Sequence, residues 1–220
     1  VPNSTEEQFK LVNDVYDGEA VKTFTNHLNH LVSNESEGLR YLIGYIADMF
    51  QNPCKLPEVA ILFKSKQGSG KDLMTSILGD ILGHKLLHKE AKMENITGTF
   101  NNSLKHKIMV QLNEVCGKDG NFNRELLKDL ITSEKLNLRE MRKDIQLQHN
   151  CLRLFLATNN RTAINIPQDD RRYVVFKCGD PKTEKYYNKI GKIKTSKKAL
   201  NSIYSYFMNY DLSKFNLKKR

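Results

Sequence analysis

The clearest chemical pattern in this 220-residue sequence is an apolar run, Glu58–Phe63, that leads into Lys64–Asp72 with its two glycines. A buried strand, a glycine-containing turn and a helix form the arrangement that points backbone N–H groups and a helix N-terminus at phosphate oxygens. Gly68 and Gly70 allow the close approach, and Lys71 is expected to reach the β- and γ-phosphates. The stretch therefore predicts a phosphate-binding loop made by Gln67, Gly68, Ser69, Gly70, Lys71 and Asp72.

Two positions of this loop differ from the pattern G-x-x-x-x-G-K-[S/T]. Ser65 stands where the first glycine belongs, and Asp72 replaces the hydroxyl residue that ligates Mg²⁺. A carboxylate is a good Mg²⁺ ligand, but its charge beside a triphosphate is favourable only with the metal between them. The alternative is a strand-to-helix turn with a surface lysine.

A second apolar run, Ile108–Glu114, ends in two polar residues. Open α/β sheets bind ligands at the carboxyl ends of their strands. Glu114 is expected to orient or deprotonate a water that attacks a phosphate, and Asn113 to be a weaker partner of Mg²⁺. The predicted metal set is Asp72, Asn113 and Glu114, partly through water. A strand followed by an ordinary polar turn is the alternative.

A third run, Cys151–Ala157, stops at Thr158 and two asparagines. The amide of Asn159 or Asn160 can hydrogen-bond both a phosphate and the attacking water without adding charge, as a sensor residue does. Further on, Arg171 and Arg172 precede an apolar strand. They are expected either to pair with the preceding Asp169 and Asp170 or to serve a neighbouring subunit.

The segment Lys135–Gln148 has apolar residues alternating with polar ones on either side of a basic centre. This is the pattern of a β-hairpin. Its tip is expected to carry Arg139, Arg142 and Lys143, where they can contact nucleic-acid phosphates. A solvated charged turn is the alternative for a hairpin taken alone.

Apolar residues at helical spacing precede and follow these strands, and they define the elements that position the predicted site. We expect an N-terminal helical region (1–52), a phosphate-loop core (53–180) with a hairpin at about 135–148, and a C-terminal helical tail (181–220). The predicted fold is α/β, with a mainly parallel sheet flanked by helices. His27 and His30 are expected to be ordinary surface or capping residues of the first region.

Composition restricts the partners of the chain. The net charge of +10 favours a polyanion such as nucleic acid. The four cysteines form no C-x-x-C pair, which fits a reducing, intracellular compartment. No apolar run has transmembrane length, so no membrane partner is expected. Because the chain starts at Val1, we expect a segment of a longer protein.

Taken together, the chain from about His27 to Asn216 resembles the superfamily three helicases, specifically the helicase part of viral and phage primase-helicases. The motifs that carry this resemblance are Gln51–Pro53, Lys66–Lys71, Phe100–Asn101, Leu112–Glu114, the hairpin segment, Ala157–Asn160 and Asp169–Arg172. The resemblance implies an AAA+-type core in a hexameric ring, with ATP and Mg²⁺ between subunits and single-stranded or forked DNA in the channel. It leaves open whether a primase domain lies upstream in the same polypeptide.

By the same resemblance, Arg172 best matches the arginine finger that acts on a neighbouring subunit, Arg171 is the second choice, and Arg142 and Lys143 fall at the channel hairpin. The leading expectation is an ATP-dependent DNA helicase. The alternatives are a ring that hydrolyses ATP weakly and remodels replication origins, or a P-loop nucleotide kinase.

Overall fold

A computed structural model describes residues 16–115, 124–159, 166 and 169–218 of the chain. Its centre is a five-stranded sheet in the order β2-β3-β6-β1-β7, in which each pair of neighbouring strands is parallel. The strands are β1 (Ala60–Lys64), β2 (Leu87–Lys92), β3 (Met109–Glu114), β6 (Arg153–Thr158) and β7 (Tyr173–Lys177). The prediction of an α/β fold with a mainly parallel sheet is confirmed.

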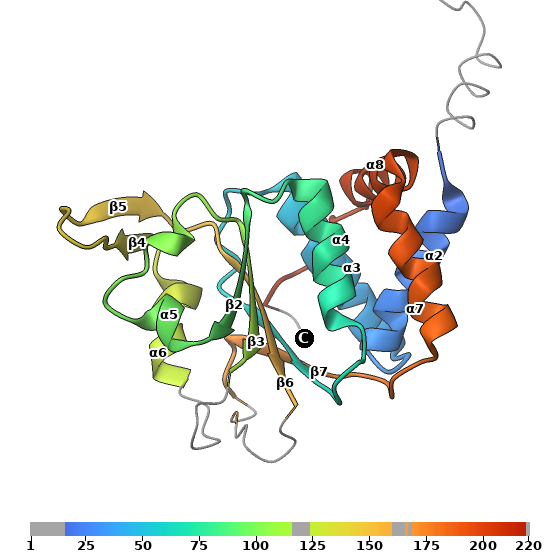
Figure 1. The fold of residues 1–220 in the computed structure, drawn as a ribbon, viewed down its shortest axis with the longest axis horizontal. Coiled ribbons are helices and arrows are strands. Elements are labelled where there is room, and N and C mark those ends of the chain that lie inside the picture. Colours follow the sequence, from blue (N-terminus) through green and yellow to red (C-terminus); the bar gives the residue numbers. More distant parts are fainter. Residues whose placement is uncertain (1–15, 116–123, 160–165, 167–168, 219–220) are drawn as a thin grey trace, which may run out of the picture.

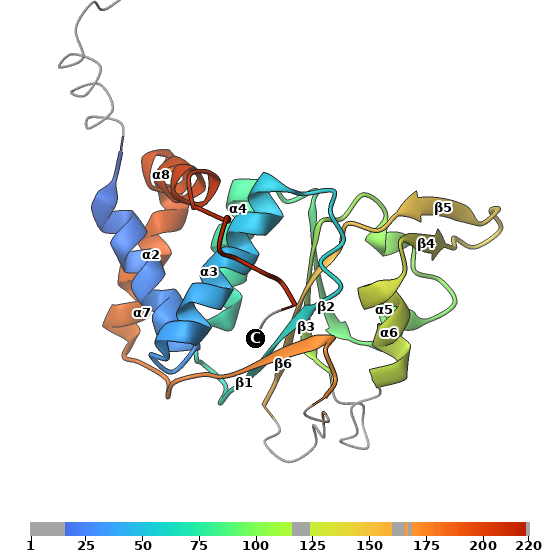
Figure 2. The same cartoon turned by 180° about the vertical axis from the view of Figure 1, so that it is seen from behind.

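Helices cover both faces of the sheet (Figures 1 and 2). One face carries α2 (Gly18–Leu31), α3 (Ser36–Gln51), α4 (Lys71–Leu82), α7 (Glu184–Gly191), the 3₁₀ turn η2 (Lys192–Thr195) and α8 (Lys197–Met208). The other carries α5 (Glu94–Thr97), the 3₁₀ turn η1 (Asn102–Leu104) and α6 (Arg124–Thr132), with the antiparallel pair β4 (Lys135–Leu138) and β5 (Gln146–His149) beyond them. No described helix combines the length and apolarity that crossing a membrane requires.

Alternation along the strands divides the apolar residues between the two faces. In β1, Ile61 and Phe63 pack with the large helical layer, whereas Ala60 and Leu62 pack with the layer of α5 and α6. Successive strand residues point to opposite faces, so a strand buried on both sides appears in the sequence as a continuous apolar run. This is why Glu58–Phe63 showed no polar interruption after its first residue.

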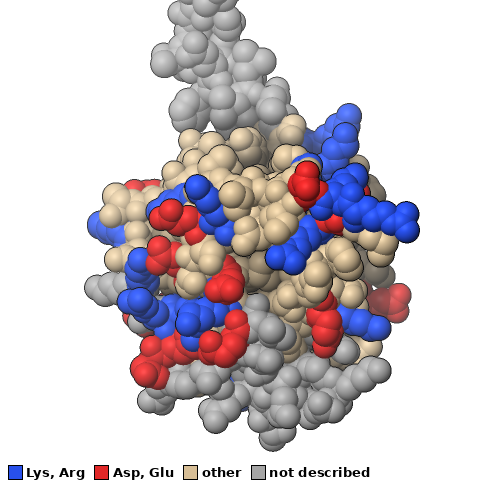
Figure 3. All heavy atoms as spheres, turned by 90° about the vertical axis from the view of Figure 1, so that its left-hand side faces the viewer, with Lys and Arg blue, Asp and Glu red and all other residues tan. Residues whose placement is uncertain are grey.

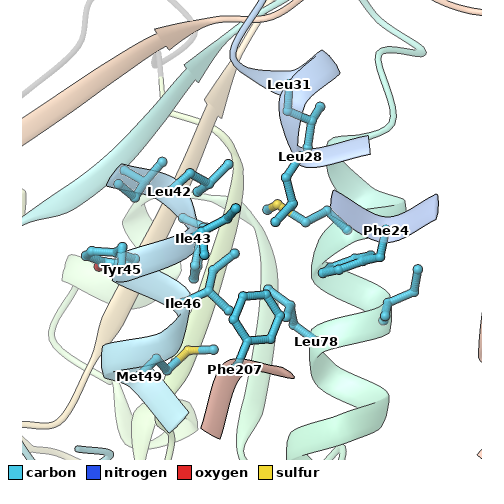
Figure 4. Packing of buried hydrophobic residues seen from close by; sticks show 14 of the residues in the cluster. Phe24, Leu28, Leu31, Leu42, Ile43, Tyr45, Ile46, Met49, Leu78 and Phe207 are labelled. Atoms are coloured by element: carbon cyan, nitrogen blue, oxygen red, sulfur yellow. The ribbon is translucent and has the colours of Figure 1, made fainter. Parts of the chain in front are cut away.

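The larger core joins helices from both ends of the chain (Figure 4). Phe24 and Leu28 of α2, Ile46 of α3, Leu78 of α4 and Phe207 of α8 all belong to one cluster and are fully buried. Each buried side chain of this kind contributes about 1.5–3 kcal/mol. The apolar stripes predicted for these helices are confirmed, while the division into residues 1–52, 53–180 and 181–220 stays a prediction.

A buried ion pair fixes α3 against the start of β6. Arg153 is fully buried, and its Nη2 lies 2.7 Å from Oδ2 of Asp48. Its Nη1 donates to the carbonyl of Lys55 at 2.6 Å. Because an isolated buried charge is very costly, the guanidinium and the carboxylate each require the other. The pair therefore anchors the first residue of β6 to α3.

Candidate functional site

The segment after β1 forms a glycine-containing turn that leads into α4. Gly68 and Gly70 have φ values of +81° and +93°, in the region that glycine adopts without steric cost. Gly70 is also the N-cap of α4, and its carbonyl accepts hydrogen bonds from the N–H groups of Leu73 and Met74 at 3.1 and 3.2 Å. The loop therefore ends at the positive end of a 12-residue helix.

Lys71 folds back into this loop. Its ammonium donates to Oγ of Ser65, and it lies 3.3 Å from Oγ of Ser69, a residue that is almost completely buried. Burial lowers the pKa of Lys71, with Cys178 and Asp72 opposing the shift. Burial also raises the pKa of the neighbouring Cys178 to about 11, so that thiol is neutral at pH 7. Ser65, which replaces the first consensus glycine, thus accepts a hydrogen bond from Lys71.

A buried glutamine links the loop helix to β3. The side-chain amide of Gln111 donates to Oδ1 of Asp72 and to Oδ1 of Asn113, and its carbonyl accepts from Oγ1 of Thr75. Gln111 is only 2% exposed. The network brings together two of the three residues predicted to hold Mg²⁺. The sequence reasoning missed Gln111, although it is a polar residue inside an apolar run, two positions before Asn113 and so on the same face of the strand.

The strand ends that were predicted to converge do lie at one edge of the sheet. Lys64 of β1 pairs with Thr158 of β6, and the N–H of Ser65 donates to the carbonyl of Thr158 at 3.1 Å. Glu114 is the last residue of β3, and Asn159 directly follows β6 and is exposed. The position of Asn160 lies outside the described residues. The predicted catalytic roles of Glu114 and the two asparagines stay predictions.

The two arginines before β7 differ in their surroundings. Nε and Nη2 of Arg172 each lie 2.9 Å from a carboxylate oxygen of Asp170. This is the ion pair that the sequence analysis gave as the alternative to a contact with a neighbouring subunit. Arg171 is exposed. Two of the Arg172 donors are therefore engaged within its own chain, which makes Arg171 the freer guanidinium for an outside contact.

His27 and His30 were expected to be ordinary surface or capping residues, and the surface part of that prediction is wrong. They are 0% and 4% exposed, and they lie between α2, α7 and the phosphate loop. Nε2 of His27 lies 3.0 Å from the carbonyl oxygen of Gly70. Burial lowers the pKa of His27 to about 4. Helical spacing identified the Phe24 and Leu28 stripe, but it could not show that the loop and α7 cover the adjoining face.

The predicted β-hairpin is present as β4 and β5, and it extends from the opposite end of the molecule (Figure 1). Arg139, Arg142 and Lys143 are all exposed at its tip. Lys143 pairs with Glu140 at 2.7 Å. Asn101 holds the end of β4 next to the tip, because its side chain accepts from the N–H of Arg139 at 2.9 Å and donates to the carbonyl of Asn137 at 3.1 Å. The basic tip is thus separate from the phosphate loop.

The described residues contain no group of three or more His, Cys, Asp or Glu side chains arranged to hold a metal ion by themselves. Asp72 and Asn113 carry oxygens of the kind that suits Mg²⁺, and Gln111 bonds one oxygen of each. Because Mg²⁺ at nucleotide sites takes only one or two protein carboxylates and completes its shell with water and phosphate, this donor set fits a metal that arrives with a nucleotide.

A family model described as "Family of unknown function (DUF5906)" matches residues 63–172. The matched stretch is half of the chain, and it includes the phosphate loop, β3, the hairpin and β6. The chain belongs to the DUF5906 family.

The DUF5906 chain is also similar to a curated protein, the DNA primase-polymerase of Nitratiruptor phage NrS-1. The two are 29% identical over 160 residues, which are 70% of this chain and 22% of the relative. The chain therefore spans about a fifth of the length of the curated relative it matches.

Two apo structures of the NrS-1 C-terminal region have the same fold. One, in the A form, aligns over 89% of this chain and 46% of its own, with a TM-score of 0.72 and 25% identity. The other, covering residues 305–718, aligns over 91% of this chain and 48% of its own, with a TM-score of 0.76 and 23% identity. The DUF5906 chain corresponds to less than half of either region.

These matches correct the assignment to the superfamily three helicases. The family is DUF5906, and the curated relative is named a DNA primase-polymerase, so the expected ATP-dependent helicase function and ATPase class are wrong. The error has a physical cause. A glycine-containing turn after a buried strand and polar residues at strand ends are features of the fold, and one fold supports many activities.

Proposed function

We propose that this chain is the nucleotide-binding part of a DNA-synthesising replication protein, and that residues 64–72 hold the triphosphate of a nucleotide. ATP with Mg²⁺ is the ligand pair to test first. The proposal is supported by the similarity to a protein named DNA primase-polymerase and by the chemistry of the loop. The activity of the longer protein is part of the proposal.

The observation that carries the proposal is the environment of Lys71. Its ammonium is partly desolvated, and its hydrogen-bond partners in the loop are two hydroxyls, those of Ser65 and Ser69. Within the described part of the chain, no carboxylate forms an ion pair with it. A partly buried cation at a helix N-terminus, beside two glycines with positive φ, favours the binding of a further negative charge. A phosphate group supplies that charge.

Asp72 and Asn113 would hold the Mg²⁺ that accompanies the phosphates, with Glu114 acting on it through water. Asp72 is exposed, and Gln111 binds one of its carboxylate oxygens. The metal would screen the carboxylate from the triphosphate, and it would thereby make this departure from the usual hydroxyl residue compatible with nucleotide binding. As a finer description of the fold, we propose an AAA+-type phosphate-loop core.

DNA is the proposed macromolecular partner, bound through Arg139, Arg142 and Lys143. The net charge of +10 and the exposed tip support this assignment. An intracellular location follows from such a role. Assembly into a hexameric ring around single-stranded DNA, with Arg171 or Arg172 reaching a neighbouring site, is the finer proposal for the quaternary structure. Sedimentation velocity with and without nucleotide measures it.

The decisive experiment is equilibrium binding of ATP in the presence of Mg²⁺ by the wild type and by Lys71→Ala. The substitution removes a charged contact to phosphate, so we expect affinity to fall by at least about tenfold, which is about 1.4 kcal/mol. Lys128→Ala, an exposed lysine on the opposite side of the sheet, is the matched control and should bind like the wild type. Equal affinity of the Lys71→Ala protein and the wild type would refute the proposal.

A further inference from the structure

A cluster of histidine and tyrosine rings packs against the phosphate loop at Gly70. The ring of His27 lies 5.9 Å from that of Tyr186 and 6.3 Å from that of Tyr187, measured between centroids. The ring centroid of His30 also lies 5.9 Å from that of Tyr186. The histidines come from α2 and the tyrosines from α7. Two helices that are remote in sequence thus meet at the loop.

Hydrogen bonds fix the tautomer of His27. The carbonyl oxygen of Gly70 can only accept, so the Nε2–H of the ring must donate to it over 3.0 Å. Nδ1 then accepts from the hydroxyl of Tyr186 at 3.2 Å. A neutral ring satisfies both contacts, and burial favours that form. Tyr186 therefore orients the imidazole, and the imidazole in turn binds the loop.

The backbone of Gly70 also packs directly against the ring. A Cβ atom at this position would lie 2.4 Å from Cε1 of His27 and 2.9 Å from Cε1 of Tyr187. Glycine is therefore required here by close approach as well as by its φ of +93°. At Gly68, by contrast, the nearest atom to such a Cβ is 3.9 Å away, on Pro181. Only the second glycine of the loop is held by the cluster.

The contact with His27 helps to fix the direction of the next N–H group, together with the two α4 amides that bond the same Gly70 carbonyl. The carbonyl of Gly70 and the N–H of Lys71 belong to one planar trans peptide, so they point in opposite directions. A donor that holds the carbonyl on the His27 side aims the N–H away from α2. That N–H is one of the unpaired donors at the N-terminus of α4, the group that an anion at a helix N-terminus binds.

We propose that His27, oriented by Tyr186, is a positioning residue that aims the Gly70–Lys71 peptide at the nucleotide phosphates. The inference rests on the proposed nucleotide-binding function. It makes the affinity of the loop depend on the docking of α2 and α7. Binding should therefore weaken when the hydrogen bond is lost, even though His27 contacts no nucleotide.

The test compares ATP affinity, with Mg²⁺ present, in the wild type, His27→Leu and His27→Gln. Leucine fills the space but cannot donate, so we expect affinity to fall by at least about fivefold. The glutamine amide can donate to the Gly70 carbonyl and should restore affinity to within about twofold of the wild type. His84→Gln is the matched control, because the side chain of His84 is 80% exposed at the far end of α4.

Two outcomes overturn the proposal: wild-type affinity in His27→Leu, or an equal loss in the glutamine and leucine variants, which would assign His27 to packing alone. If His27→Leu does not fold, Tyr186→Phe replaces it. This variant keeps the ring and removes the hydroxyl, and its affinity should fall by about twofold or more. Wild-type affinity in Tyr186→Phe would overturn the orienting role.

A measurement without nucleotide separates this inference from the proposed function. The N–H groups of Leu73 and Met74 donate to the carbonyl of Gly70, so their hydrogen exchange should accelerate by at least about fivefold in His27→Leu and not in His84→Gln. If the wild type fails to bind ATP but this acceleration is seen, the proposed function fails and the positioning of the loop stands. Unchanged exchange overturns the inference whatever the nucleotide result.

Discussion

The phosphate loop and the tip of the β4–β5 hairpin are both candidate anion sites, but they are built in opposite ways. The loop contains Ser65 and Ser69, both buried, and it is contacted by α2, α7 and the ends of β6 and β7. The hairpin instead leaves large apolar side chains exposed, among them Met141 at 64% and Leu147 at 68%. Figure 3 shows this end of the molecule, where basic side chains are interspersed with acidic ones.

The difference matches the two ligands proposed. A triphosphate is small, and donors must be held at fixed positions to bind it, so a rigid loop supported from behind is advantageous. A DNA backbone is long and regular, and lysines and arginines bind it mainly by charge, with little demand on geometry. Stability and affinity should therefore be sensitive to substitution at the loop and tolerant of it at the hairpin.

The largest difference in stability is expected between alanine substitutions of two arginines, Arg153 and Arg139. Arg153→Ala leaves Asp48 buried without its main partner and should lower the free energy of unfolding by about 3–5 kcal/mol. Because β6 ends beside Ser65, nucleotide affinity should fall as well. Arg139→Ala at the hairpin should change stability by less than about 0.5 kcal/mol. Urea denaturation measures both, and similar losses in the two variants would contradict the contrast.

The next contrast lies within the loop, between its two left-handed glycines. Alanine at either position adopts an unfavourable backbone conformation, which costs roughly 1–2 kcal/mol. Gly70→Ala in addition forces its Cβ against His27 and Tyr187, for about 1–3 kcal/mol more. Thermal unfolding should therefore rank Gly70→Ala below Gly68→Ala. If Gly68→Ala is the less stable protein, the supported side of the loop has been misidentified.

Acid should affect the loop region before the hairpin. The pKa of His27 is about 4 in the folded chain and about 6.5 when unfolded. Between these values the unfolded chain holds a proton that the folded chain releases, so this contribution to stability is complete above pH 6.5 and is lost as pH falls toward 4. Through His27, the free energy of unfolding should fall by roughly 2 kcal/mol between pH 7 and pH 5.

The groups that face this pair of histidines are Tyr186 and Tyr187, with Lys182 and Asp180 beside His30. His30, whose pKa burial also lowers, adds to the loss in the same direction. Urea denaturation at the two pH values, repeated with His27→Gln, isolates the His27 part. An equally steep loss in that variant would assign the pH dependence to other groups.

The smallest effect on stability is expected for the double substitution Arg142→Ala with Lys143→Ala. Both residues are exposed, so unfolding should be unchanged within about 0.5 kcal/mol and ATP affinity within about twofold. Affinity for single-stranded DNA should fall, and the slope of its logarithm against that of salt should decrease by about 1.4. Filter binding over a salt series measures this slope, and an unchanged slope would exclude the tip from the DNA contact.

What could be predicted from the sequence is what depends on near neighbours along the chain. Glycines before Lys71, the apolar run of β1 and the alternation at β4 and β5 are local patterns, and they correctly indicated the turn, the parallel sheet and the hairpin. His27, Gln111 and Arg153 were missed as partners, because each contacts a residue more than 30 positions away. A pattern within one element holds no information on which distant element covers it.

The activity was mispredicted for a related reason. Glu114 ends β3, Asn159 follows β6 and Lys71 begins α4, in an order that the fold itself imposes, so their arrangement is a feature of the fold. It does not identify the reaction. The family match and the name of the similar protein, a DNA primase-polymerase, overturned the helicase assignment that the motifs had suggested.

The order of the strands also bears on how the chain acquires its structure. In the described sheet, β1 pairs with β6 and β7, as in Ile61 with Phe155 and Leu62 with Val175, and both strands come late in the sequence. Sheets assembled from such distant pairs form slowly, because a long loop must close before any contact compensates the lost entropy. During synthesis on the ribosome, the apolar β1 therefore has no strand to pair with until β6 has been synthesised. Chaperones that shield exposed strands should raise the yield of native protein.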